Sequence, residues 1–218
     1  MNYRPIVVFD FESDSPNASS CNIVQIGAIV LDSRTLKEKW GGRFNMKVKP
    51  PGIDKIDDYL TEERKNTIAW HAKNRDMTSE EIIEEWSTSC DEKHAWECFV
   101  DFVMSFNRKK TSFTAPIPCG MNIKDFDIPI AKRLCEKYKT KTLFWWRDAY
   151  DIQQCCFEWF ESREDAPYNH KLETVCEYVG VENKQAHDAL SDVIVEAYIA
   201  RRFLKLNRRL APKIKFGE

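Results

Sequence analysis

The 218-residue sequence lacks several features that would place it in a specialised class of protein. No apolar run approaches the roughly 20 residues that a membrane-spanning helix needs, so no membrane partner is expected. The first residues, 1–5, lead into a short apolar segment rather than into the core and cleavage site of a signal peptide. Internal repeats and low-complexity linkers are also absent. We therefore expect a cytoplasmic protein with a single domain over residues 1–218.

Paired cysteine spacings are absent too, although cysteine itself is not rare. The eight cysteines form no Cys-x-x-Cys pair and have no His-x₃₋₅-His partner, which argues against zinc and disulfide frameworks. Reduced thiols packed in the core are the simpler interpretation. Adjacent Cys155 and Cys156 leave a thiol or redox enzyme as an alternative, but no base or orienting acid stands beside them.

The chain carries little net charge, formally −2, which argues against a protein that coats long nucleic acids by bulk electrostatics. The charges are nevertheless unevenly distributed. Residues 54–101 are strongly acidic, whereas residues 124–147 and 201–215 are rich in lysine and arginine. The basic segments are either solvated helix faces or a grip for a few phosphates, and the sequence leaves both interpretations open.

The apolar patterns predict an α/β fold in which helices pack on a sheet. Helical structure is expected through residues 54–107, where the best amphipathic stretch covers 92–106. Further helices are expected at 128–138, 151–161, 171–179 and 187–206. Strands are expected at 5–11, 23–31, 36–48, 116–121 and 143–146.

Asp10 and Glu12 end the first expected strand. Residues i and i+2 of a strand point to the same face, so the two carboxylates project together. Like charges at this spacing repel unless a cation neutralises them. Two exposed acids at the end of a strand are the simpler alternative, and this pattern alone does not decide between them.

The segment from Asn122 to Asp127 follows the expected strand at 116–121 and enters a helix. Such strand-to-helix turns commonly present ligand-binding side chains in α/β folds. Phe126 is suited to anchor the turn in the core while Asp127 faces a crevice. Alternatively, Asp125 or Asp127 simply caps the following helix.

His187 and Asp192 open the last amphipathic helix. Asp192 lies among Ala189, Val193 and Ala197, so we expect it to face inward, where a carboxylate needs a partner. A metal ion is the simplest such partner. A histidine at the start of a helix is more often structural, but here it stands next to an inward acid.

Taken together, the three segments resemble the DEDDh exonucleases, the superfamily of DnaQ-type proofreading nucleases and oligoribonuclease-like enzymes. The motifs occur in the superfamily's order and span residues 7–198. Position 188 is aspartate, where the tyrosine branch has tyrosine, so the histidine branch is indicated. The resemblance implies an RNase H-like mixed five-stranded sheet flanked by helices, with a helical insertion at about 54–107.

A narrower likeness links the chain to the DexA exonuclease of T-even phages and related bacterial exoribonucleases. Residues 67–70, 120–130 and 144–148 carry it. It implies a cytoplasmic protein, bacterial or encoded by a phage. Two departures stand out: Ser13 replaces a common threonine, and the middle motif is one residue longer than in DnaQ types. The longer spacing makes Asp125 a competitor of Asp127, although the preceding Phe126 favours Asp127.

The resemblance implies that Asp10, Glu12, Asp127 and Asp192 hold two divalent ions about 4 Å apart. Hard oxygen ligands without thiolates suit Mg²⁺ or Mn²⁺ better than zinc. His187 would act as the general base that accepts the proton of the attacking water. The implied reaction is 3′→5′ hydrolysis that releases nucleoside 5′-monophosphates from the end of a strand.

The expected partner is a single-stranded 3′ end, of DNA or of RNA. By resemblance, Phe11 and Ser13 would contact the terminal nucleotide, and Asn122 would bond to a nearby sugar or phosphate. Trp70 either stacks on a base, worth roughly 1–3 kcal/mol, or belongs to the core.

Two other functions compete with the exonuclease prediction. A catalytically inactive RNase H-like module that binds nucleic acid would lack at least one metal ligand, whereas this sequence keeps all four acids and the histidine. An endonuclease or transposase of related fold would cut circular single strands, which an exonuclease leaves intact.

Overall fold

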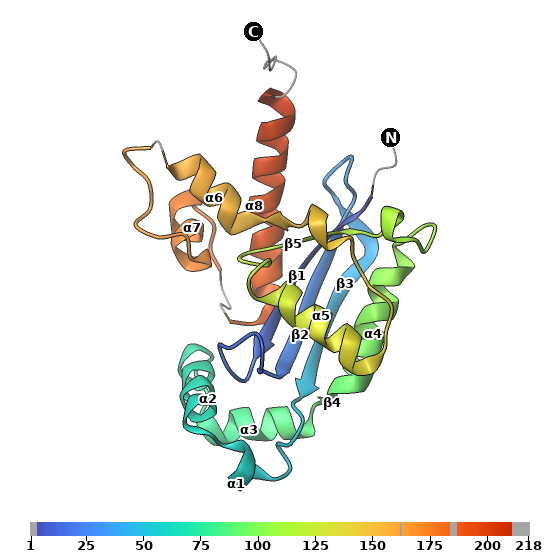
Figure 1. Ribbon diagram of the computed structural model, residues 1–218. Helices are drawn as coiled ribbons and strands as arrows, with labels where there is room; N and C mark the ends of the chain where they lie inside the picture. Colours follow the sequence, from blue (N-terminus) through green and yellow to red (C-terminus); the bar gives the residue numbers. More distant parts are fainter. Residues whose placement is uncertain (1–3, 162, 184–186, 211–218) are drawn as a thin grey trace.

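The computed structural model describes residues 4–161, 163–183 and 187–210. Within these residues a six-stranded mixed sheet forms the centre, in the order β4-β3-β2-β1-β5-β6 (Figure 1). β1 pairs with β2 and β2 with β3 antiparallel, and the other neighbours are parallel. The strands are β1 (Ile6–Ser13), β2 (Ile23–Leu31), β3 (Glu38–Lys49), β4 (Cys90–Asp91), β5 (Ile117–Gly120) and β6 (Tyr150–Asp151).

Helices cover both faces of this sheet (Figure 1). No helix in the described part of the chain combines the length and the apolar character that crossing a membrane requires. The α-helices are α1 (Ile56–Tyr59), α2 (Glu62–Asn74), α3 (Ser79–Thr88), α4 (Glu92–Ser105), α5 (Asp127–Tyr138), α6 (Ile152–Phe160), α7 (Leu172–Val179) and α8 (Ala189–Leu210).

The predicted α/β class is confirmed, but the sheet differs from the expected five strands. The strand expected at 143–146 is wrong: Leu143 and Phe144 are buried in the core outside the sheet, where Phe144 stacks on Phe9 with ring centroids 5.3 Å apart. The edge position belongs instead to β6. A short apolar segment fits a buried strand and a buried irregular segment equally well, which explains the error. β4 contains only two residues and has no periodic signal.

The alternation of β1 places its acids on one face of the sheet. Val7, Phe9 and Phe11 point into a core shared with α4 and α5. Ile6 and Val8 point into a second core, shared with α6, α7 and α8. Asp10 and Glu12 continue this second series, because successive strand residues point to opposite faces. Both carboxylates therefore emerge on the side that α8 covers.

Gly27 allows α8 to approach the sheet closely beside this face. A Cβ atom on Gly27 would lie 2.4 Å from the carbonyl carbon and oxygen of Ala189, closer than real contacts allow. Gly27 is also the partner of Asp10 in the β1–β2 register. The absent side chain at this one position therefore brings the first turn of α8 next to Asp10.

The helical segment between β3 and β5 has two parts. α1, α2 and α3 form a small apolar cluster of their own, whereas α4 packs into the main core. The fully buried carboxylate of Asp14 ties the small cluster to the loop after β1. It accepts hydrogen bonds from Asn22 and from the Tyr59 hydroxyl, and it pairs with Arg64 at 3.0 Å. This connection holds α2 beside the end of β1.

Candidate active site

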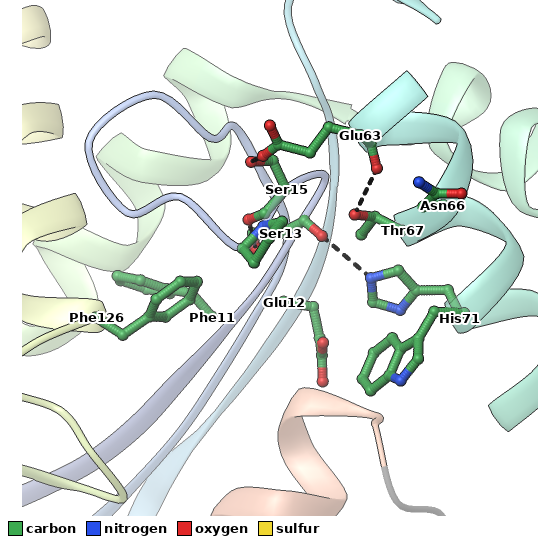
Figure 2. Close-up of a pocket in the computed structure, with 11 residues that line it drawn as sticks. Phe11, Glu12, Ser13, Ser15, Glu63, Asn66, Thr67, His71 and Phe126 are labelled. Carbon is green, nitrogen blue, oxygen red and sulfur yellow. Dashed lines mark hydrogen bonds between the residues drawn. The ribbon is translucent and has the colours of Figure 1, made fainter. Parts of the chain in front are cut away.

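The predicted acids and histidine come from strand β1, helix α5 and the start of helix α8. Asp10, Glu12, His187 and Asp192 line a single cavity of about 500 Å³. Within it, ligand-type atoms of Glu12, His187 and Asp192 lie within 4.8 Å of one another. Figure 2 shows the Glu12 carboxylate directed toward the first turn of α8. Asp127 does not line this cavity, but it is bonded to the backbone of β1.

Asp127 occupies the first turn of α5 and is 2% exposed. Its Oδ1 accepts a hydrogen bond from the Phe11 N–H at 2.9 Å, between Asp10 and Glu12. Asp125, the competing candidate, is exposed to solvent. The turn before α5 begins at Asn122, whose φ of 54° is a left-handed conformation that asparagine tolerates better than most residues. Asn122 lines the cavity.

His187 enters α8 in a left-handed conformation, with φ 68°. This backbone conformation directs the His187 N–H to Asp192 Oδ2, 3.1 Å away. The imidazole packs on the Trp70 ring, with centroids 4.2 Å apart, and its Nε2 lies 3.3 Å from Glu173. Backbone strain of this kind costs about 1–3 kcal/mol and persists only where several contacts fix it.

Asp192 lies inward in the first turn of α8, 8% exposed. Besides the His187 N–H, it accepts a hydrogen bond from the Asn183 side chain. Asp188 stabilises the start of the helix, because its Oδ1 accepts a bond from the Ser191 N–H at 3.0 Å. Its other oxygen accepts a bond from Gln25 of β2. α8 is therefore fixed to the sheet at the turn that carries Asp192.

The clustered acids strongly disfavour ionisation in the absence of a cation. Burial raises the pKa of Glu12 to about 8, and the charges of Asp192 and Asp127 add to the effect. Burial also raises the pKa of Asp127 to about 8, against the opposing hydrogen bond from Phe11. The pKa of Asp10 is raised well above its ordinary value by burial and by the charges of Asp127 and Glu12. Such mutual repulsion is relieved when positive charge binds between the carboxylates.

The donor atoms of the cavity fit a hard divalent cation. Carboxylate oxygens dominate, an imidazole stands at the side, and none of the described residues lining the cavity is a cysteine. Mg²⁺ and Mn²⁺ prefer such oxygen ligands. Asp10, Glu12, Asp127 and Asp192 are the residues that would hold the cations.

A second cavity, of about 680 Å³, opens on the other side of Glu12, between the loop after β1 and helix α2 (Figure 2). Aromatic rings of Phe11, Trp70 and Phe126 line it. Polar groups come from Ser13 and, in addition, Ser15, Glu63, Asn66 and Thr67. Trp70 lines both cavities and forms part of the boundary between them.

The three other predicted substrate residues differ in how they face this second cavity. Trp70 is 45% exposed, so it is not a core residue. Phe11 is 3% exposed and packs edge-on against Trp96 and Phe99, so most of its ring belongs to the core. The Ser13 hydroxyl donates to the Ser15 carbonyl oxygen at 2.8 Å rather than pointing freely into the cavity.

Three residues near the site were missed by the sequence analysis. Glu196, 2% exposed, lines the acidic cavity, and Glu173 pairs with His187. His71 is buried beneath Trp70, and its Nε2 lies 3.1 Å from the Ser13 carbonyl oxygen. Glu196 could have been found from its spacing, because it follows Asp192 by one helical turn on the same face.

The adjacent cysteines do not form a second reactive centre. Cys156 is fully buried, and burial raises the pKa of its thiol to about 12. Cys155 is half-buried, and its pKa is also raised by burial. A nucleophilic cysteine needs a lowered pKa, so both thiols are suited to packing rather than to catalysis.

A family model described as an exonuclease, named RNase T, matches residues 7–200. The chain belongs to this exonuclease family. The match confirms the predicted resemblance to the DEDDh exonucleases and supports a nuclease. No curated protein matches the chain at a significant level.

Solved structures share the exonuclease fold at low sequence identity. Escherichia coli exonuclease I with a dT13 oligonucleotide superposes with a TM-score of 0.69 at 17% identity, over 96% of this chain and 43% of that protein. A zinc-bound complex of the same enzyme with single-stranded DNA gives 0.69 at 17% identity, over 97% and 42%. The chain thus spans less than half the length of exonuclease I.

A 3′-exonuclease that recognises the 3′ end of a histone mRNA stem-loop shares the fold as well. It superposes with a TM-score of 0.61 at 15% identity, over 93% of this chain and 64% of that one. The fold therefore occurs in proteins whose structures contain DNA and in proteins that recognise RNA.

Proposed function

We propose that this exonuclease-family chain removes nucleotides from the 3′ end of a single strand, releasing nucleoside 5′-monophosphates with the aid of two divalent cations, Mg²⁺ or Mn²⁺. The observation that carries the proposal is the convergence of Glu12, His187 and Asp192 within 4.8 Å, in one cavity with Asp10. Asp127, bonded to the strand between Asp10 and Glu12, supplies the fourth carboxylate.

The cations, when bound, supply Lewis-acid activation of a water molecule and stabilise the charge that develops on the leaving oxygen. His187 accepts the proton of the attacking water as general base. Trp70 and Glu173 orient its imidazole, one by ring packing and the other by contact with Nε2. Asp10, Glu12, Asp127 and Asp192 would hold the cations through their negative charge and carboxylate oxygens.

The second cavity is the place we assign to the terminal base. Its aromatic lining offers stacking to any base, and it adjoins Glu12, which also lines the acidic cavity. The remaining strand would leave along α6, where a smaller cavity shares Asn122 and Gln153 with the acidic one. Lys124 supplies positive charge there, and exposed Phe157 supplies an aromatic ring.

The decisive experiment follows 5′-labelled single-stranded DNA and RNA oligomers of the same sequence with Mg²⁺, Mn²⁺ or EDTA. We expect a ladder of products shortened by one nucleotide at a time, which disappears with the chelator. An oligomer with a blocked 3′ end should persist, and so should a circular strand. Cutting of the circle would indicate an endonuclease instead.

If the protein binds the DNA or RNA oligomer but shortens neither, the inactive RNase H-like binding module is favoured. Asp10→Asn is the matched control, because it replaces a carboxylate with a group of the same size. It should abolish the ladder. The faster of the two ladders identifies the preferred sugar.

A further inference from the structure

Glu196 is a buried acid in the cavity that none of the sequence motifs contains. It follows Asp192 by one turn on α8, is 2% exposed, and lines the same cavity as Asp10, Glu12 and Asp192. Residues four apart on a helix share a face, so Asp192 and Glu196 point in the same direction. The close approach of α8 to the sheet at Gly27 brings this face to the acids of β1.

The two carboxylate oxygens of Glu196 have different surroundings. Oε1 accepts a hydrogen bond from the Met121 N–H at 3.2 Å, in the segment that leads to Asn122. Oε2 is buried and has no hydrogen-bond partner among the described residues. A buried polar oxygen without a partner is costly in a folded protein, and more so when it carries charge. The orphaned oxygen therefore needs a partner of another kind.

Bonding to Met121 does not by itself require an acid at this position. The carbonyl oxygen of a glutamine would accept the same hydrogen bond without the repulsion that Asp127 and Asp192 exert on Glu196. An acid becomes favourable here when a cation is present, because oxygen ligands and negative charge then stabilise the bound ion.

We propose that Glu196 is a fifth carboxylate of the metal site, whose Oε2 binds a divalent cation directly or through a water of its hydration shell. The inference rests on the proposed function, since it uses the same cations. Glu196 lies outside the four acids of the family's motifs, and the inference predicts that the Mn²⁺ affinity of this chain depends on the residue at position 196.

The test titrates Mn²⁺ into the metal-free full chain by isothermal calorimetry. We expect Glu196→Gln to weaken Mn²⁺ binding by roughly 10–100-fold, the range for groups that support a metal site. The same variant should raise the Tm of the metal-free protein, because an ionisable group that is unfavourable to bury among other acids is replaced by a neutral amide while the bond to Met121 is kept. Glu196→Asp retains the charge but withdraws its oxygens, so it should give an intermediate affinity.

Glu92→Gln is the matched control. Glu92 is also a buried glutamate, 1% exposed, and its Oε1 likewise lacks a partner among the described residues, but it sits on α4 and pairs with Lys137 and Tyr138. This variant should leave the Mn²⁺ affinity unchanged.

The outcomes separate this inference from the proposed function. If Asp10→Asn abolishes Mn²⁺ binding but Glu196→Gln binds like the unaltered chain, Glu196 has only a structural role and the inference is overturned. If the unaltered chain itself binds no Mn²⁺, or Asp10→Asn has no effect, the metal site of the proposed function fails, and the fifth ligand fails with it.

Discussion

Without a divalent cation, the protein should become less stable as the pH rises from about 6.5 to 8. Burial raises the pKa of Glu12 and of Asp127 to about 8, so in the folded chain both carboxyls keep most of their protons until the pH approaches 8. In the unfolded chain their pKa values are near 4, and both are already ionised. The folded state therefore binds more protons, and the free energy of unfolding falls as the pH rises.

The size of the effect follows from the same linkage. A carboxyl with a pKa near 8 when folded and near 4 when unfolded loses about 1.5 kcal/mol of stabilisation between pH 6.5 and 8. Glu12 and Asp127 together give about 3 kcal/mol, or roughly 6–12 °C in Tm for a chain of this length. His71 acts in the opposite direction, because burial lowers its pKa to about 4 and the neutral imidazole becomes more favourable as the pH rises. This effect is small, since it lowers the free energy of unfolding by less than about 0.5 kcal/mol at pH 6.5.

Calorimetric melting of the EDTA-treated chain at these two pH values measures the change directly. Glu12→Gln should reduce the pH dependence by about 1.5 kcal/mol, since one of the contributing carboxyls is gone, while Asp10 and Glu196, whose pKa values burial also raises, continue to act in the same direction. Saturating Mn²⁺ should suppress it, because the cation stabilises the ionised carboxylates. A metal-free Tm that stays flat or rises toward pH 8 would refute the argument that the acids repel one another in the folded chain.

Three further substitutions test the catalytic residue, the packing of α8 and the strand path. His187→Ala should lower kcat by roughly 10²–10⁴-fold with oligonucleotide affinity largely intact, and an unchanged turnover in single-turnover kinetics would exclude it as general base. Gly27→Ala should destabilise the chain by about 1–3 kcal/mol and weaken Mn²⁺ binding, because the new methyl group overlaps the backbone of Ala189. Chemical denaturation measures the stability, and an unchanged free energy of unfolding would contradict this prediction. Phe157→Ala should cost roughly 1–3 kcal/mol of binding to a single-stranded oligomer, because a base is expected to stack on this 52% exposed ring. Fluorescence anisotropy at fixed salt measures the affinity, and an unchanged affinity would exclude stacking on Phe157.

The sequence was sufficient to predict the elements with strong periodicity. β2 occupies the expected residues, and the long helices begin and end close to their predicted positions. The apolar stripe of α4 was visible because Ala95, Phe99 and Val103 recur at helical spacing. The edge strands β4 and β6 were not predictable, since two-residue strands are defined by their neighbours rather than by any pattern of their own.

The candidate site was predictable as a set of residues but not as a geometry. Asp10 and Glu12 share a face because strand alternation requires it, whereas the contact of Trp70 with His187 depends on how α2 is tied to the sheet. The left-handed backbone of His187 is equally invisible in the sequence, because it results from tertiary contacts. Glu196 is different, because its position one helical turn after Asp192 places it on the same face of α8, and this spacing is visible in the sequence.

The arrangement of the acids explains why the rest of the site is held so firmly. Mutual repulsion between Asp10, Glu12 and Asp127 tends to push β1 and α5 apart, and it acts most strongly before a cation arrives. Two restraints oppose this tendency: the bond from the Phe11 N–H to Asp127, and the contact of α8 with Gly27. Because neither restraint involves a cation, both hold the carboxylates close together whether or not one is bound. The same preorganisation accounts for the predicted stability loss at high pH, since a flexible site would relieve its repulsion by moving apart.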